Sequence, residues 1–166
     1  KALYYYFRSV SRRFNSNGIN LAEYIFSKEY KVNVRNSLND ISKAIELNPN
    51  DATFYSARGG SYTILGKYKL AVSDYQNAIN INPIYSNYSG LGDAKNKLKD
   101  YRGALNAYNK AIELVEKVRE KKLYLSIRGE IKYKLRDYEG SCTDFKEAKS
   151  LGHNSPEMKK GLERCS

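Results

Sequence analysis

One stretch of the chain, residues 65–83, decides the fold: it reads Leu65-Gly-Lys-Tyr-Lys-Leu-Ala-Val-Ser-Asp-Tyr-Gln-Asn-Ala-Ile-Asn-Ile-Asn-Pro83. Gly66 and Lys67 predict a tight turn. Apolar side chains then recur at the spacing of an amphipathic helix, for example at Ala71, Tyr75 and Ala78. Pro83 ends the pattern, because proline cannot continue a helix and disfavours helical angles at the residue before it.

The same pattern recurs along the chain. Matching alanines stand at Ala44, Ala78, Ala111 and Ala148, with separations of 34, 33 and 37 residues. The apolar spacing predicts pairs of helices over residues 52–65 with 68–81, 85–98 with 101–115, and 121–135 with 138–150. Further helices are expected over 20–31 and 35–47, with an indistinct boundary near residues 32–34. The chain is therefore predicted to be an array of helix pairs.

The repeated positions form a consistent set. A large residue recurs at Tyr55, Tyr88 and Leu125, a small one at Gly59, Gly92 and Gly129, a turn aromatic at Tyr68, Tyr101 and Tyr138, and a helix aromatic at Tyr75, Tyr108 and Phe145. A period near 34 with two helices per unit is typical of the tetratricopeptide repeat. Over roughly residues 18–152 the chain resembles that family.

The resemblance implies an all-α fold, an α-solenoid in which antiparallel helix pairs form a right-handed superhelix with a C-terminal capping helix. We expect a single domain over 1–166, divided into an N-terminal helix (2–17), a degenerate repeat (18–51), repeats at 52–84, 85–118 and 119–152, and a capping helix (154–166). Ser155 and Pro156 suit the start of that last helix. Small residues let paired helices approach closely.

Some positions depart from the family pattern. Arg58 and Arg128 stand where the family prefers leucine, and Lys95 and Lys132 where it prefers an aromatic residue. We expect these long side chains to bury their stems and to keep their charges in water. The 37-residue step inserts about three residues near Arg119, which predicts a lengthened second helix with a basic, exposed end.

The composition limits the classes of function. The net charge is +11, but basic residues are dispersed, which leaves binding of RNA or an anionic membrane as an alternative and not as the first interpretation. Two cysteines are too few for a disulfide framework or a structural zinc site, and Cys142 is interpreted as a small buried apolar residue. No stretch approaches the roughly 18 apolar residues of a membrane-spanning helix. A cytoplasmic location is expected.

Catalytic and metal-binding patterns are not found in the sequence. The lone His153 has no partnering nucleophile, and neither a glycine-rich phosphate loop nor metal-ligand spacing occurs. We therefore predict that the protein is not an enzyme and has no cofactor or metal. The expected function is a protein–protein interaction scaffold that binds a peptide or helix of another protein, with nucleic acid and membrane unlikely as partners.

The resemblance also implies where such a partner docks, because the first helices of successive units line the concave groove in this family. The corresponding residues are Phe26, Tyr30, Ser56, Gly60, Thr63, Ile64, Ser89, Asp93, Asn96, Lys97, Ser126, Glu130, Tyr133 and Lys134. Some family members hold the C-terminal carboxylates of chaperones through lysine and asparagine in this groove. Here those positions hold Ser56 and Gly60, which disfavours a chaperone tail as the partner.

Overall fold

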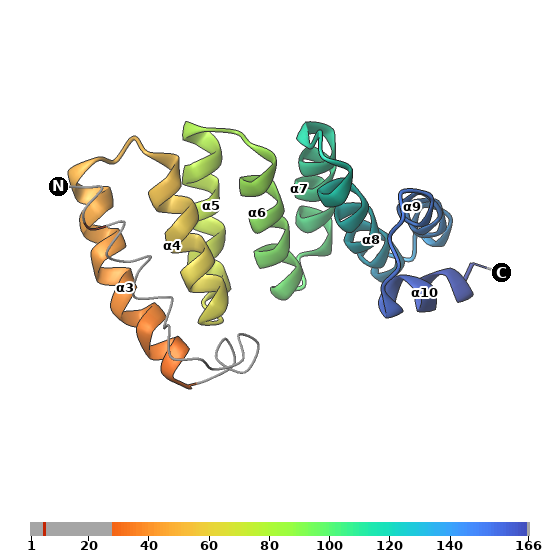
Figure 1. Ribbon diagram of the computed structural model, residues 1–166, viewed down its shortest axis with the longest axis horizontal. Coiled ribbons are helices and arrows are strands. Elements are labelled where there is room, and N and C mark those ends of the chain that lie inside the picture. Colours follow the sequence, from red (N-terminus) through yellow and green to blue (C-terminus); the bar gives the residue numbers. More distant parts are fainter. Residues whose placement is uncertain (1–4, 6–27, 166) are drawn as a thin grey trace. The chain divides into compact units, whose positions relative to one another are not determined.

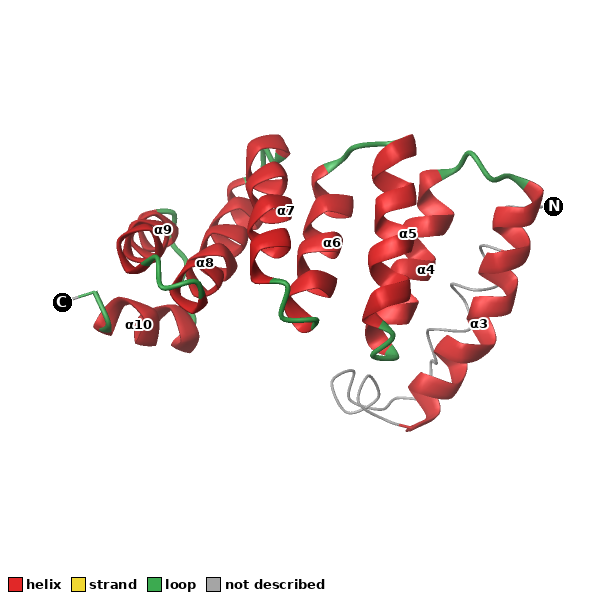
Figure 2. Ribbon diagram, turned by 180° about the vertical axis from the view of Figure 1, so that it is seen from behind, coloured by secondary structure: helices red, strands yellow, loops and turns green. Residues whose placement is uncertain are grey.

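The protein is seen in a computed structural model that describes Tyr5 and residues 28–165 (Figure 1). The chain divides into two compact units, Lys1–Pro83 and Ile84–Ser166. Every regular element in the described part is a helix, as the secondary-structure view shows (Figure 2). The predicted all-α class is therefore confirmed. Among the helices described, none is long and apolar enough to cross a membrane.

The first unit contains α3 (Lys28–Leu47), α4 (Ala52–Ile64) and α5 (Tyr68–Ile81). Helices α4 and α5 pack as a hairpin, and α3 packs against α4. Ile41 and Phe54 are central to the buried core of this unit. The expected boundary near residues 32–34 is wrong, because α3 continues through it without a break.

The second unit contains two hairpins and a terminal helix. The first hairpin pairs α6 (Tyr85–Lys97) with α7 (Tyr101–Leu114). The second pairs α8 (Val118–Lys134) with α9 (Tyr138–Ser150), and α10 (Pro156–Glu163) follows. Helix α8 also packs on α7, where Tyr108 and Ile131 are fully buried.

The turns within the hairpins lie where the sequence predicted them. Gly66, Lys99 and Arg136 adopt the left-handed conformation, with φ of 72°, 62° and 65°. This conformation ends a helix and is easiest for glycine, so the two other residues carry some strain. The residues that follow, Asp100 and Asp137, then cap the next helix by accepting a backbone N–H bond of 2.9 Å.

The recurring glycines permit close helix contact. A Cβ atom added to Gly92 would lie 2.7 Å from the ring of Tyr108, and one added to Gly129 would lie 2.9 Å from Phe145. Distances this short are not tolerated in a packed interior. The repeated small and aromatic positions therefore face each other across each hairpin.

Arg58 and Arg128 do not place their charges in water, contrary to the expectation from the sequence. Each guanidinium donates two hydrogen bonds of 2.7–2.8 Å to a buried aspartate of the partner helix, Asp74 or Asp144. The aspartate side chains are only 4% and 1% exposed. A charge this deeply buried is stable only when it is paired.

The two lysines at departing positions also have partners in the protein. Lys132 Nζ lies 3.1 Å from Asp144, and Lys95 Nζ lies 3.4 Å from Asp100. The expectation that the charge lies in water is therefore wrong for Lys132, whose partner is buried, whereas the partner of Lys95 is 49% exposed and that pair lies at the surface.

The inserted residues of the 37-residue step lengthen a different helix from the expected one. Helix α7, the second helix of its pair, ends at Leu114. The extra turn belongs to α8, which begins at Val118 and carries the basic side chains of Arg119, Lys121 and Lys122 near its start. Lys122 is held there, because its Nζ donates to the Gly152 carbonyl at 3.1 Å.

Cys142 is not a free apolar residue, contrary to the expectation from the sequence. It forms a disulfide with Cys165, with 5.5 Å between the two Cα atoms. This bond joins α9 to the residues that follow α10. The predicted capping helix is present, and Ser155 caps it by accepting a bond from the Met158 N–H at 3.2 Å.

Candidate functional site

A cavity of about 490 Å³ lies in the second unit, between α8 and the α10 segment. Its lining combines apolar, amide, hydroxyl and charged groups, from Asn96, Leu123, Ser126, Ile127, Glu130, Lys134, His153, Ser155, Glu157, Lys160 and Arg164. Ligand sites in proteins typically combine an apolar floor with a few polar groups of this kind.

The α8 side of the cavity follows from helical spacing. Leu123, Ser126, Ile127, Glu130 and Lys134 recur at intervals of three and four residues, which places them on one face of the helix. The structure therefore brings four of the predicted groove residues together: Asn96, Ser126, Glu130 and Lys134. Leu123 and Ile127 were missed, although the same spacing indicates them.

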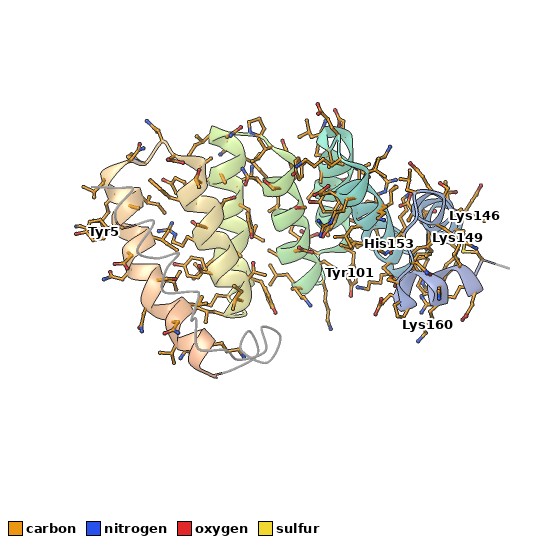
Figure 3. The ribbon with its side chains drawn as sticks, in the orientation of Figure 1. Tyr5, Tyr101, Lys146, Lys149, His153 and Lys160 are labelled. Atoms are coloured by element: carbon orange, nitrogen blue, oxygen red, sulfur yellow. A yellow bond between two sulfur atoms is a disulfide. The ribbon has the colours of Figure 1, made fainter. Side chains whose placement is uncertain are left out.

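The opposite side of the cavity is formed by residues that the repeat pattern does not include. His153 and Ser155 precede α10, Glu157 and Lys160 lie on it, and Arg164 follows it. Figure 3 shows His153 and Lys160 at this end of the second unit. These residues have no counterpart in the other hairpins, so no comparison within the sequence could have identified them.

The charged groups around the cavity are partly matched with one another. Lys134 donates to the Asn96 amide oxygen at 3.2 Å and lies 5.0 Å from the centre of the Tyr101 ring. Arg164 lies 3.7 Å from the Glu130 carboxylate. The cavity has three cationic side chains and two carboxylates, so a ligand carrying a carboxylate is favoured over one carrying an amine.

Tyr133 was predicted as a groove residue, but it is not part of the cavity lining. Its ring packs edge-on against Tyr138, with 5.1 Å between centroids, and Arg164 lies 4.5 Å from its centre. A cation over an aromatic face is attracted by the ring quadrupole. Tyr133 therefore helps to hold Arg164 at the rim of the cavity.

Asp93 was also predicted for the groove, and it has a perturbed titration. Surrounding protein removes water from its carboxylate and so raises its pKa above the ordinary value, although a bond from the Tyr108 hydroxyl at 2.5 Å and the charge of Lys97 oppose the change. Part of its side chain still faces water. Asp93 is thus fixed by Tyr108 on α7 and presents a carboxylate beside Lys97.

Ser89 lies one turn before Asp93 on α6. Its hydroxyl donates to the Ser86 carbonyl at 3.0 Å. It also bonds with Tyr124 of α8, whose pKa is raised because burial disfavours the phenolate, while that bond acts in the opposite direction. Ser89 therefore contributes to the packing of α6 near α8.

The predicted groove residues of the first unit lie together on α4. Ser56, Gly60 and Thr63 recur along one side of the helix, and Ile64 follows with 37% of its surface exposed. The Thr63 hydroxyl is bonded to the Gly59 carbonyl at 3.0 Å. Phe26 lies outside the described residues, and Tyr30 falls within α3, where its side chain is not described.

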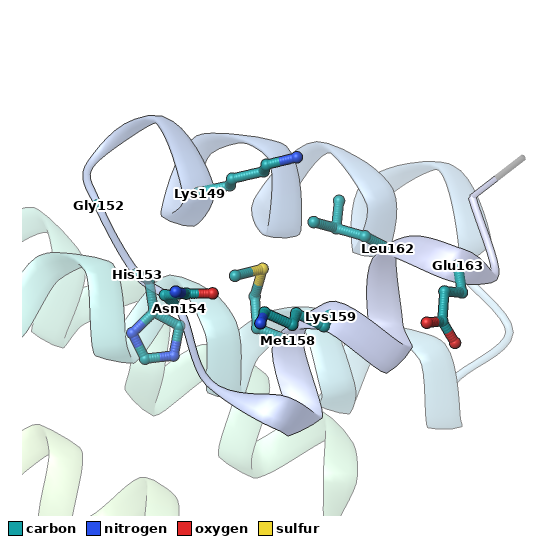
Figure 4. A pocket seen from close by; sticks show the side chains of 8 residues that line it. All are labelled: Lys149, Gly152, His153, Asn154, Met158, Lys159, Leu162 and Glu163. Atoms are coloured by element: carbon teal, nitrogen blue, oxygen red, sulfur yellow. The ribbon is translucent and has the colours of Figure 1, made fainter.

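A second hollow, of about 820 Å³, lies between the end of α9 and α10 (Figure 4). Lys149 and Lys159 stand at its edge, and Met158 and Leu162 form part of its apolar lining. Within the described residues there is no group of three or more histidine, cysteine or acidic residues that could hold a metal ion.

Comparison with known proteins places the repeats in a family. The profile described as "Tetratricopeptide repeat" matches residues 52–85 and 85–117. Small glutamine-rich tetratricopeptide repeat-containing protein 2 of Saccharomyces cerevisiae is 34% identical over 89 residues, which are 53% of this chain and 25% of the relative. Hsp70-Hsp90 organizing protein 2 of Arabidopsis thaliana is 32% identical over 89 residues, 53% of this chain and 15% of that protein. The chain thus spans a quarter or less of the length of these relatives.

Solved structures share the fold. The crystal structure of MamA protein superimposes with a TM-score of 0.80 and 14% identity, covering 97% of this chain and 78% of that one. The structure titled "First TPR of Spaghetti (RPAP3) bound to HSP90 peptide SRMEEVD" gives a TM-score of 0.63 and 23% identity, covering 69% and 89%. Together with the repeated glycines and aromatics, these matches show that residues 52–117 are tetratricopeptide repeats and that the chain shares its fold with a solved tetratricopeptide repeat structure.

Proposed function

We propose that this chain is a non-enzymatic interaction module, and that its second unit binds a segment of a partner protein in the cavity between α8 and α10. The observation that carries the proposal is that Asn96, Ser126, Glu130 and Lys134, from the first helices of successive hairpins, line one cavity. The relatives named as organizing proteins of chaperones, and the neighbour solved with a bound peptide, support a protein as the partner.

The lining indicates the chemistry of the segment. Leu123 and Ile127 offer apolar surface for one aliphatic or aromatic side chain. Lys134 and Lys160 offer ammonium groups to a carboxylate, and the Asn96 amide can pair with an extended backbone. A segment with an apolar residue beside an acidic one satisfies these groups.

The experiment begins with selection of a binding peptide from a random displayed library, followed by its affinity for matched variants. Leu123→Ala, in the cavity, is expected to weaken binding about tenfold, a loss of about 1.4 kcal/mol. Leu114→Ala, on α7 and outside the cavity, is the control, because the two leucines are 45% and 42% exposed. Equal affinities of both variants for every selected peptide would contradict the proposal.

A second pair of variants tests the charge. Lys134→Ala is expected to weaken binding of an acidic peptide, whereas Lys110→Ala, an exposed lysine of α7 paired with Glu113, is not. The peptide SRMEEVD is the comparison probe for a chaperone tail. Since Ser56 and Gly60 occupy the positions that hold such tails in the family, the first unit is not expected to bind it, and any preference over its scrambled form should disappear in Lys134→Ala.

The net charge of +11 favours one other candidate, binding of RNA or an anionic membrane. Phosphate binding weakens steeply with salt, whereas an apolar anchor does not. Retention of a generic RNA at low salt, lost at physiological salt and unaffected by Leu123→Ala, would support this alternative and would exclude the cavity as its site.

A further inference from the structure

The disulfide links α9 to the end of the helix that forms one side of the cavity. Cys142 lies in α9, and Cys165 comes two residues after Glu163, where α10 ends. Helix α10 has only eight residues. Isolated helices of this length are not stable in water, so α10 keeps its conformation only while it is held against its neighbours.

Non-covalent contacts hold the middle of α10. Met158 is almost fully buried, and Gly161 lies so close to Phe145 of α9 that a Cβ atom there would be 2.6 Å from the ring. These contacts involve one face of two turns. The last turn is held by the covalent bond through Cys165 and by the contacts of Arg164 with α8.

Arg164 connects this bond to the cavity. It directly precedes Cys165 in the chain, and it reaches both the Glu130 carboxylate and the Tyr133 ring. Of the eleven residues that line the cavity, five come from His153 onward. Loosening the end of α10 would therefore move Arg164 away from the rim of the cavity.

The disulfide is accessible to a reductant. Both sulfur-bearing residues line a surface hollow of about 470 Å³, together with Lys146 and Arg164. A thiolate can enter such a hollow, because its two cations, Lys146 and Arg164, outnumber its one carboxylate, Glu139, and so favour both the attacking thiolate and the thiolate that leaves.

We propose that the Cys142–Cys165 disulfide controls the binding cavity, which is complete when the bond is formed and loses its α10 side when the bond is reduced. The proposal rests on the proposed function of that cavity. The reductant is a dithiol: one of its thiolates attacks a sulfur of the bond, forms a mixed disulfide and releases a cysteine thiolate, which takes up a proton. The second thiol of the dithiol then attacks the mixed disulfide and releases the other cysteine as a thiolate, which also takes up a proton. Two electrons and two protons pass to the protein, and the dithiol becomes a disulfide.

The first measurement is hydrogen exchange in the oxidised protein, in the protein treated with dithiothreitol, and in the Cys142→Ser/Cys165→Ser variant. The amides of α10 are expected to lose protection in the two forms without the bond, while those of α7 and α9 keep theirs. Retained protection in α7 and α9 shows that the unit stays folded. Equal protection of α10 in all three forms overturns the proposal.

The second measurement is the affinity of a displayed peptide whose binding depends on Leu123. Dithiothreitol is expected to weaken it about tenfold, and reoxidation to restore it. The double serine variant, which cannot form the bond, is the control and should bind weakly with or without dithiothreitol. Unchanged or tighter binding after reduction overturns the regulation but leaves the proposed function intact. If no selected peptide depends on Leu123, the proposed function fails, and the regulation fails with it.

Discussion

The buried pair of Arg128 and Asp144 allows a quantitative test, because the chain contains its own apolar replacement. In the hairpin of α6 and α7, the equivalent positions hold Leu91 and Ala107, both buried. The perturbation is therefore Asp144→Ala alone, and then Asp144→Ala together with Arg128→Leu. The first leaves a charge without its partner, and the second copies a solution that the same fold already uses.

The magnitude follows from the geometry. Asp144 is 1% exposed, accepts two bonds of 2.8 and 2.7 Å from Arg128, and lies 3.1 Å from Lys132 Nζ. Removing one partner of such a pair costs about 3–5 kcal/mol. Arg128 is 17% exposed and keeps its 3.0 Å bond to the Asn109 side chain, so we expect a cost at the lower end of this range. Replacing both partners by well-packed apolar residues is often neutral. We expect the free energy of unfolding of the double variant to lie within about 1 kcal/mol of the parent's. Lys132 loses Asp144 in this variant, but it keeps its bond to the Gly140 carbonyl.

The assay is urea unfolding, monitored by far-ultraviolet circular dichroism. It compares the parent, Asp144→Ala, Arg128→Leu and the double variant. The cycle isolates the interaction between the two side chains, which is expected to exceed about 2 kcal/mol. The explanation is refuted if Asp144→Ala costs less than about 1 kcal/mol, or if Arg128→Leu fails to recover stability in its presence.

The other predictions concern packing, pH and the disulfide. Gly92→Ala is expected to destabilise the protein by about 1–2 kcal/mol because its methyl group would meet a buried ring at 2.7 Å, whereas Gly60→Ala, with 3.6 Å of space, should stabilise α4 by up to about 1 kcal/mol in the same unfolding assay. The raised pKa of Asp93 means that its carboxyl group binds a proton more tightly in the folded state than in the unfolded chain. The free energy of unfolding therefore falls as the pH rises from the unfolded pKa through the folded pKa. Asp93→Asn should therefore stabilise the protein at neutral pH but not below the ordinary pKa of 3.8, and an equal gain at both pH values would contradict this account. The 23-residue separation of Cys142 and Cys165 predicts that reduction lowers the free energy of unfolding of the second unit by about 3 kcal/mol, measured by urea unfolding with and without dithiothreitol.

The fold was predictable because the same residue types recur at equivalent positions in each hairpin. Gly92 opposite Tyr108 and Gly129 opposite Phe145 obey one packing rule, and Pro83 ends a helix at a position the repeat requires. Each repetition makes a chance match less credible. Helix ends in the described repeats consequently agree with the prediction to within a few residues.

The buried ion pairs were missed, although a signal was present. Asp74 and Asp144 occur in the hairpins that carry Arg58 and Arg128, whereas the hairpin with Leu91 has alanine in place of aspartate. This joint variation between two positions indicates contact. Treating each arginine as an isolated departure from the pattern hid it.

The candidate site was predicted in part, for a related reason. Residues on α8 follow helical spacing, so Ser126, Glu130 and Lys134 were identified from the repeat. The α10 side of the cavity and the disulfide occur once in the chain and have no internal counterpart. Nothing in the spacing of Cys142 and Cys165 indicates that they meet.

The buried Arg–Asp pair is present in two hairpins and absent from the one between them, and this difference has a consequence for folding. Helices in a repeat protein resemble one another, so a helix can pair with the wrong partner before the correct one arrives. If α4 were to pair with α7 in place of α5, Arg58 would face Ala107 and its charge would be buried without an acid. Helix α8 packs on α7 in the native unit, but the same mismatch would arise if α8 took the hairpin position of α6, with Arg128 against that alanine. The hairpins α4/α5 and α8/α9 contain the ion pair, and the hairpin α6/α7 between them does not. A wrong hairpin formed by helices from neighbouring hairpins therefore leaves a charge buried without its partner, which disfavours it.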